Sequence, residues 1–139
     1  MRIIKFRGKR ISSGDWQFGD LSHSQNDVVV NEKYTTNRLI NGMWIFPETV
    51  GQFTGLYDKN GKEIYEGNLI KQINFNGEQY EAIYEVVYSG ESFCLKMLKG
   101  NEKAMSNNSL SSFGYYNEDC ILRKGEVIGN IHDNPELLK

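Results

Sequence analysis

The chain has 139 residues, of which 39% are hydrophobic and 12% aromatic, and its formal net charge is −2 at pH 7. This balance excludes the composition of a disordered chain. It also argues against a protein whose whole surface binds nucleic acid, because phosphate neutralisation needs an excess of Lys and Arg. We expect a single domain over residues 1–139, and two small subdomains at about 1–56 and 57–139 are the open alternative.

The chain shows no targeting or membrane signal. No apolar stretch approaches the ~18 residues of a membrane helix, and Met1 is not followed by an apolar signal segment. We therefore expect a cytoplasmic protein without a membrane partner. In that compartment Cys94 and Cys120 are expected to be reduced thiols, although a bridge between them stays an open alternative.

The N-terminal segment is strongly basic. Residues 2–7 predict a strand that pairs with a second strand over 15–21, where Trp16 and Phe18 share a face. Alternation along the first strand places Lys5, Arg7 and Lys9 on one face. Such a stripe could contact phosphates, helped by a stacking ring such as Trp16 or Tyr34, or could be a solvated edge strand. The nucleic-acid-binding candidates are Arg2, Lys5, Arg7, Lys9 and Arg10.

An aromatic segment forms a second candidate surface. Residues 23–27 predict a polar loop, residues 28–30 a short buried strand, and residues 42–46 a strand that Pro47 stops. Residues 48–54 are a further strand candidate. If the side chains of the segment that ends at Pro47 stay partly exposed, they would contact a protein partner or another subunit. Burial of these side chains is the simpler alternative. The partner-contact candidates are Trp44, Ile45 and Phe46.

The middle of the chain predicts a tight corner and a hairpin. Residues 53–70 contain two turns, in which Gly61 and Gly67 need the positive φ that glycine adopts at little cost. Asn76-Gly77 then predicts a type I′ turn between strands 68–75 and 78–89. A two-residue loop would set Phe75 opposite Glu78 and Leu69 opposite Tyr84, with Leu69 and Tyr84 on one apolar face.

The closing segments complete a mainly β fold. Residues 93–98 and 126–131 predict strands, and Asn134-Pro135 starts a last helical turn. We expect antiparallel hairpins that form one or two small barrel-like sheets, including an SH3-like arrangement, with little helix. Tyr80, Tyr84 and Tyr88 share a strand face and are interpreted as core, whereas exposed rings at these positions would form a base-stacking platform.

No constellation of residues predicts catalysis. His23 and His132 lack the partners of a triad, and the sequence has no spacing typical of a zinc site. Asp58 to Gly61 predicts a turn, because the alternating ligands of a calcium loop are missing. We therefore expect no catalytic residue, no cofactor, no metal and no small-molecule substrate.

Three separated segments stand out together: the basic opening with Gly14-Asp15-Trp16 and Gly19-Asp20-Leu21, the segment Thr49–Leu56 followed by 58–67, and the closing residues 126–131 with 134–138. In these three segments the chain resembles the YopX family. Asn68 departs from the family pattern, which usually has Asp there, and Tyr57 stands where a charge is common. The resemblance implies a small, mainly β protein encoded by bacteriophages and prophages, and it supplies no activity.

Together these features predict a non-catalytic accessory protein of a phage or prophage in the bacterial cytoplasm. We expect it to bind a protein partner or to self-assemble. The alternative is nucleic-acid binding through the basic N-terminal strand, and an enzyme is not expected.

Overall fold

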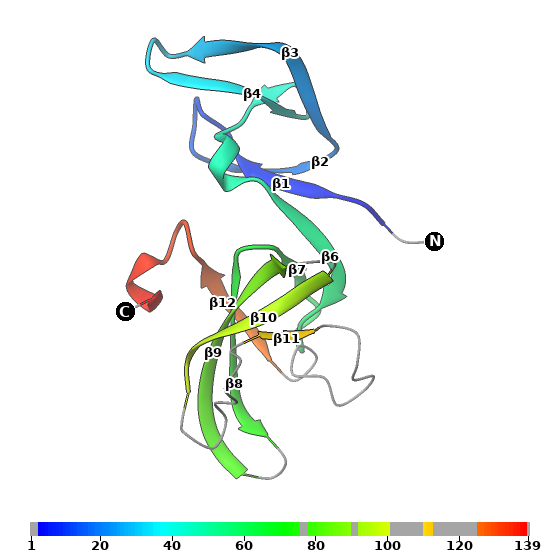
Figure 1. Ribbon diagram of the computed structural model, residues 1–139, viewed down its shortest axis with the longest axis vertical. Coiled ribbons are helices and arrows are strands. Elements are labelled where there is room, and N and C mark those ends of the chain that lie inside the picture. The colour runs from blue at the N-terminus through cyan, green and yellow to red at the C-terminus, as the bar shows by residue number, and fades with distance from the viewer. Residues whose placement is uncertain (1–2, 76–77, 90–91, 101–109, 113–124, 139) are drawn as a thin grey trace. The chain divides into compact units, whose positions relative to one another are not determined.

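A computed structural model describes residues 3–75, 78–89, 92–100, 110–112 and 125–138 of the chain. It divides into two compact units, Met1–Gly55 and Leu56–Lys139. Figure 1 shows that both are built almost wholly from strands. The expectation of a mainly antiparallel β fold with little helix is therefore confirmed. The strands that the structure describes form three open sheets rather than a closed barrel.

The first unit contains two small sheets. One has β1 between β2 and β6, and the last residues of β6 run on into the second unit, where β7 is the next strand. The other has the order β3-β4-β5. The elements that begin in this unit are β1 (Phe6–Lys9), β2 (Trp16–Gly19), β3 (Leu21–Val30), β4 (Tyr34–Ile40), β5 (Met43–Trp44), the 3-10 turn η1 (Pro47–Thr49) and β6 (Gly51–Tyr57).

Two tight turns set the β3-β4-β5 sheet. Asn41 and Gly42 have φ values of 53° and 75° and join β4 to β5 with Ile40 opposite Met43. Positive φ at both central positions is the type I′ hairpin geometry that Asn-Gly favours. Asn31 and Glu32 (φ 56° and 60°) turn β3 into β4. The Asn41-Gly42 pair is the local sequence signal for this hairpin.

Three predictions for this unit are wrong. Residues 23–27, interpreted as a loop, belong to β3, with an irregular register between His23 and Val28. The strand at 28–30 is not buried, since Val29 is 64% exposed at the sheet edge. The strand candidate at 48–54 is wrong at its start: Glu48 and Thr49 belong to η1, because Pro47 fixes the φ of a first helical position, whereas residues 51–54 lie in β6 as predicted.

The apolar centre of the first unit lies between β1 and the β4–β5 hairpin. Ile40 and Ile45 are fully buried. A Cβ added at Gly8 would lie 2.3 Å from Cγ2 of Ile45. Only a residue without a side chain permits this approach, so Gly8 brings the β1 backbone onto Ile45.

The second unit is organised around a five-stranded antiparallel sheet with the order β11-β10-β9-β8-β12. Its elements are β7 (Glu63–Tyr65), β8 (Asn68–Phe75), β9 (Glu78–Ser89), β10 (Ser92–Lys99), β11 (Leu110–Ser112), β12 (Glu126–Asn130) and the 3-10 turn η2 (Pro135–Leu138). The predicted last helical turn is thus present as η2. Gly61 and Gly67 have φ values of 81° and 90°, as predicted.

The β8–β9 register begins as predicted and then departs from it. Phe75 pairs with Glu78, but a bulge between Gln72 and Asn74 shifts every later pair by one residue. Ile70 therefore faces Tyr84, and Leu69 faces Glu85. The prediction that Leu69 and Tyr84 share a face is wrong, because one extra residue on β9 exchanges the two faces of the hairpin.

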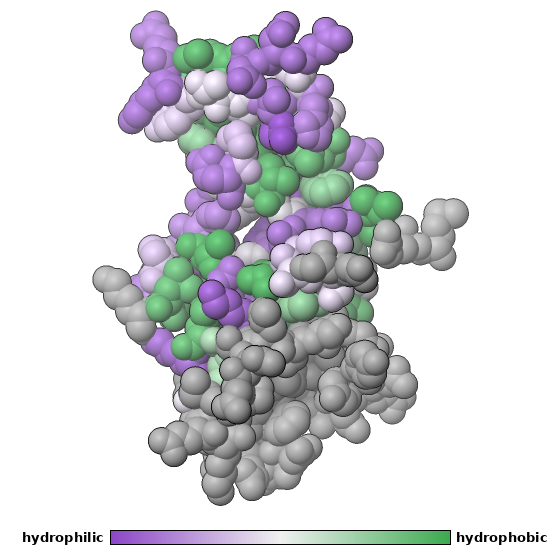
Figure 2. All heavy atoms as spheres, viewed as in Figure 1, coloured by the Kyte–Doolittle hydropathy of each residue, from purple (hydrophilic) through white to green (hydrophobic). Residues whose placement is uncertain are grey.

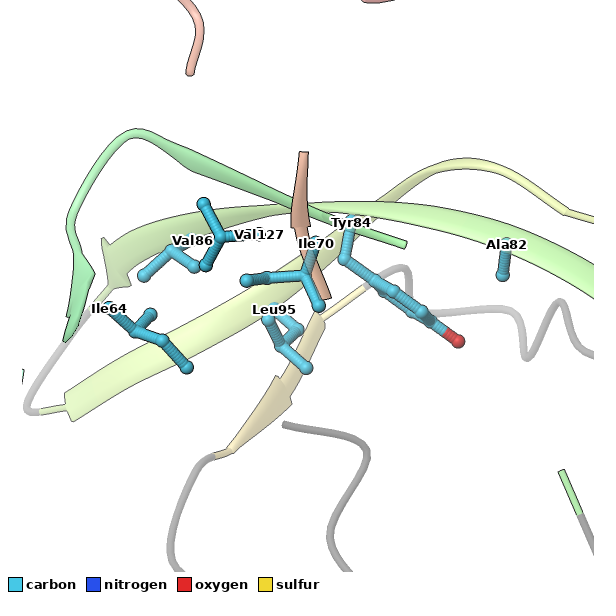
Figure 3. Packing of buried hydrophobic residues seen from close by; sticks show 7 residues of the cluster. All are labelled: Ile64, Ile70, Ala82, Tyr84, Val86, Leu95 and Val127. Atoms are coloured by element: carbon cyan, nitrogen blue, oxygen red, sulfur yellow. The ribbon is translucent and has the colours of Figure 1, made fainter. Parts of the chain in front are cut away.

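The shifted register builds the core of the second unit. Figure 3 shows Ile70, Tyr84, Val86 and Leu95 directed to one side of the sheet. The buried cluster comprises Ile64, Ile70, Ala82, Tyr84, Val86, Leu95 and Val127. Leu69, on the opposite face, is also fully buried, so both sides of the sheet are covered at this point.

The tyrosines predicted to be core residues of β9 differ in their exposure. Tyr84 is 3% exposed and belongs to the core, as expected, whereas Tyr88 is 54% exposed and packs edge-on against Phe93, with 5.1 Å between ring centroids. The Tyr80 side chain lies outside the described residues.

Candidate binding face

The β1–β2 hairpin places cations and aromatic rings on one face of its sheet. Lys9 pairs with Trp16 and Arg7 pairs with Phe18 in an antiparallel register. Residues directly opposite each other in such a pair share a face, so alternation adds Lys5 to the same side. On the other edge, the N–H of Phe53 donates to the carbonyl of Lys5 (2.7 Å), which brings in a third ring.

Each cation on this face lies over an aromatic ring. The Arg7 guanidinium is 4.4 Å and the Lys9 ammonium 5.6 Å from the ring centroid of Trp16. The Lys5 ammonium is 5.4 Å from that of Phe53. Distances within about 6 Å are typical of cation–π attraction. We call the set Lys5, Arg7, Lys9, Trp16, Phe18 and Phe53 the cation–aromatic face.

The side chains of the cation–aromatic face differ in exposure: some are buried and others are accessible to a partner. Arg7 and Phe53 are buried, at 7% and 2% exposure. Lys5, Lys9 and Trp16 are half-buried, and Phe18 is 46% exposed. The residues that can meet a partner are therefore the two lysines and the two rings of β2, whereas the Arg7 guanidinium is buried against the Trp16 ring.

The other predicted basic residues are placed elsewhere. Arg10 follows Lys9 directly, so its side chain points to the opposite side of the strand. Its backbone forms an isolated antiparallel β-bridge with Ile45, and Arg10 does not belong to the face. Arg2 lies outside the described residues. Tyr34, the alternative stacking ring, packs edge-on against Phe46, with 4.8 Å between the ring centroids. Of the five basic candidates, the structure brings together Lys5, Arg7 and Lys9.

The predicted partner segment is built into the first unit. Ile45 is fully buried, and Trp44 and Phe46 are half-buried. The Ile45 N–H donates to the Arg38 carbonyl (3.0 Å), and the Phe46 N–H donates to the Lys9 carbonyl (2.9 Å). This segment therefore connects β4 to β1 through its backbone.

The Asp58 carboxylate accepts three hydrogen bonds from backbone N–H groups of the second unit. Its Oδ1 accepts from the N–H groups of Asn60 (2.8 Å) and Lys62 (2.9 Å), and its Oδ2 accepts from the N–H of Val127 (2.9 Å). Burial alone would raise the pKa of Asp58. These hydrogen bonds, with the charge of Lys62, outweigh burial and hold the pKa below its usual value.

Two asparagines complete the same kind of local bonding. Asn68 accepts from the Tyr65 N–H (2.7 Å) through Oδ1 and donates to the Gly129 carbonyl (3.1 Å) through Nδ2. Asn130 Oδ1 accepts from the N–H groups of His132 and Asp133, both at 2.9 Å. These side chains hold turns against strands.

The remaining candidates stand apart from one another. His23 is exposed on β3, His132 is half-buried beyond β12, and Cys94 is a buried free thiol. Cys120 lies outside the described residues. Within the described part of the chain, no three His, Cys, Asp or Glu side chains are grouped to hold a metal ion. No helix in that part is long and apolar enough to cross a membrane.

Sequence reasoning missed the contribution of Phe53 and the exposure of Phe18. The alternation of residues 16–18 already set Phe18 on the side of Trp16, so its exposure was the only unknown. Phe53 joins the face through the pairing of β6 with β1, in which Arg7 faces Gly51. A pairing between segments so far apart in the sequence leaves no local signal.

Fold and face together define a small antiparallel β protein with a mixed cationic and aromatic surface. The model of the YopX protein family matches residues 5–139. The chain therefore belongs to this family, as the resemblance indicated.

The fold of the chain is similar to that of a solved structure. The chain is similar to a crystal structure of protein EF1440 from Enterococcus faecalis, with a TM-score of 0.56, 19% sequence identity and 100% of both chains covered. No curated protein matches the chain.

Proposed function

We propose that this protein is a non-catalytic accessory protein of a bacteriophage or prophage that binds another macromolecule in the bacterial cytoplasm. Family membership supports the proposed origin. A binding rather than a chemical role is supported by the use of Asp58, Asn68 and Asn130, whose polar atoms are engaged by backbone groups.

The cation–aromatic face is the observation that carries the proposal, and nucleic acid is the partner class that it favours. Lys5 and Lys9 supply charge for phosphates, and the exposed ring of Phe18, next to Trp16 on β2, supplies a surface for bases. The first unit has seven Lys or Arg against five Asp or Glu, whereas the second has nine against thirteen. The face thus lies on the more basic unit.

The proposal is tested by fluorescence anisotropy with a labelled oligonucleotide at about 20 mM salt, where phosphate contacts are strongest. Replacing Lys5 and Lys9 by Gln should weaken binding. Lys33→Gln is the matched control, since the Lys33 ammonium lies 5.2 Å from the Tyr34 ring but outside the face. Equal binding by both variants, or no binding by the unmodified protein, would refute nucleic acid as the partner.

A protein partner or self-assembly is the second candidate function. Val29 is 64% exposed on β3, which is the edge strand of its sheet. Figure 2 shows that mainly hydrophilic side chains surround the few apolar ones at the β3–β4 end of the first unit. Edge strands pair readily with other chains. Light scattering should then give a mass above the 16.0 kDa of one chain, and a constant 16.0 kDa at rising concentration would exclude self-assembly.

A further inference from the structure

We infer that the cation–aromatic face binds single-stranded rather than duplex nucleic acid, with the Phe18 ring stacking on an unpaired base. The inference rests on the proposed nucleic-acid function and names its substrate class. It is carried by the arrangement of one exposed ring between two partly exposed lysines, over a buried arginine.

Register places the Phe18 ring between the two lysines. Phe18 is directly opposite Arg7, so Lys5 and Lys9 occupy the two diagonal positions on the neighbouring strand. Two residues of extended chain span about 6.6 Å, so the two lysines lie about 13 Å apart along residues 5–9 with the ring between them. A base on Phe18 would therefore have a cation on either side for its flanking phosphates.

Burial explains why Phe18, and not Trp16, is the proposed stacking ring. The Trp16 ring is already covered by the Arg7 guanidinium at 4.4 Å and approached by Lys9 at 5.6 Å. Phe18 is 46% exposed. Arg7, which is 7% exposed, acts as a positioning residue that holds Trp16 beside Phe18 rather than as a phosphate contact.

The small number of cations on the face favours a single strand over a duplex as the ligand. Binding to duplex without base readout depends on phosphate neutralisation, and two lysines supply little of it. The exposed acids Asp15 and Asp20 at the ends of β2 reduce it further. Stacking adds a favourable term that only an unpaired base can use, because the base faces in a duplex are occupied by neighbouring pairs. The face is therefore matched to a single strand.

The test compares a labelled oligo-dT of about 12 nucleotides with a duplex of the same length, by anisotropy at low salt. We expect the single strand to bind at least tenfold more tightly than the duplex. Phe18→Ala should weaken single-strand binding about tenfold, and Phe18→Tyr should restore it, since stacking on one base is of that order. Phe18→Leu keeps an apolar side chain without a ring and should behave like Phe18→Ala. Val29→Ala is the control for loss of an exposed apolar side chain.

The outcomes distinguish the inference from the function beneath it. Equal binding of single strand and duplex, lost in the Lys5→Gln and Lys9→Gln variants but not in Phe18→Ala, would overturn the inference and keep nucleic-acid binding. If neither the single strand nor the duplex binds but labelled polyglutamate does, the inference and the proposed nucleic-acid function are both overturned. The face would then be assigned to an acidic protein partner. With two phosphate contacts, the logarithm of affinity should fall with the logarithm of salt at a slope of about −1.4.

Discussion

The Asp58 carboxylate accepts a hydrogen bond of 2.9 Å from the backbone N–H of Val127, which is 69 residues further along the chain. Its other oxygen closes the turn between β6 and β7 through Asn60 and Lys62. One buried side chain, 6% exposed, thereby joins the central corner of the sequence to the start of β12. This is why the turn Asp58 to Gly61 needs an acid, although it holds no calcium ligand set.

Asp58→Asn should destabilise the protein strongly. The amide keeps the size of the carboxylate but presents an NH₂ group to one of the N–H donors, so a buried donor loses its acceptor. Hydrogen bonds to a charged group and an unsatisfied buried donor together correspond to about 2–4 kcal/mol. Urea unfolding measures this loss, and Asp20→Asn, at an exposed acid, should change the free energy of unfolding by less than about 0.5 kcal/mol. Equal effects of the two variants would show that the carboxylate is not a structural link.

The same carboxylate predicts how stability depends on pH. The pKa of Asp58 is lower in the folded than in the unfolded state, because its backbone hydrogen bonds and Lys62 outweigh burial. Its contribution is therefore complete above the unfolded pKa of about 3.9 and is lost as pH falls through the lower folded value. Thermal unfolding between pH 7 and pH 2 should show this acid loss in the unmodified protein. The Asp58→Asn variant should lose less over that window.

Glu85 should behave in the opposite way. Burial raises the pKa of Glu85, and the nearby charge of Lys96, its cross-strand partner, offsets burial only in part. Its folded pKa lies above its unfolded pKa, so the charged side chain costs stability at neutral pH, and that cost disappears as pH falls below the unfolded value. Glu85→Gln should therefore raise Tm at pH 7 and leave it nearly unchanged below about pH 4. A lower Tm at pH 7 would mean that attraction to Lys96 exceeds the burial penalty.

Gly8→Ala should destabilise the first unit through a clash with Ile45. The new Cβ would lie 2.3 Å from Cγ2 of Ile45, a fully buried side chain without room to move. Overpacking of this kind costs about 1–3 kcal/mol. The check is a double-mutant cycle with Ile45→Ala, in which the pair should cost less than the sum of the single variants. Strict additivity would place the cause of the loss elsewhere.

The sequence predicted those parts of the fold that local chemistry determines. Positive φ at Gly61 and Gly67 follows from turn composition, and the pairing of Phe75 with Glu78 follows from a two-residue loop. The bulge beyond that pair was not predictable, because apolar residues at both 69 and 70 satisfy either face. Tertiary packing on Leu95 and Val127 makes the choice.

The candidate face was predictable to a similar extent. Period-two alternation set Lys5, Arg7 and Lys9 on one side, and that is where they lie. The burial of Arg7 depends on how closely Trp16 packs over it, and Phe53 arrives from a distant strand. Neither property has a signature in the local pattern, so the division into buried and accessible residues does not follow from the sequence alone.

Asn68→Asp provides a final test at the point where the chain departs from the family pattern. Asn68 Nδ2 donates to the Gly129 carbonyl at 3.1 Å, and a carboxylate would set an oxygen against that carbonyl instead. Its other oxygen would still accept from the Tyr65 N–H, as Oδ1 does now at 2.7 Å. At pH 7 the variant should lose about 1–3 kcal/mol, the cost of a broken hydrogen bond in a buried position. Protonation restores a donor, so the difference between variant and unmodified protein should narrow as pH falls toward 4, when followed by urea unfolding. A difference that stays constant with pH would mean that the Asn68–Gly129 hydrogen bond does not determine the choice of amide over acid.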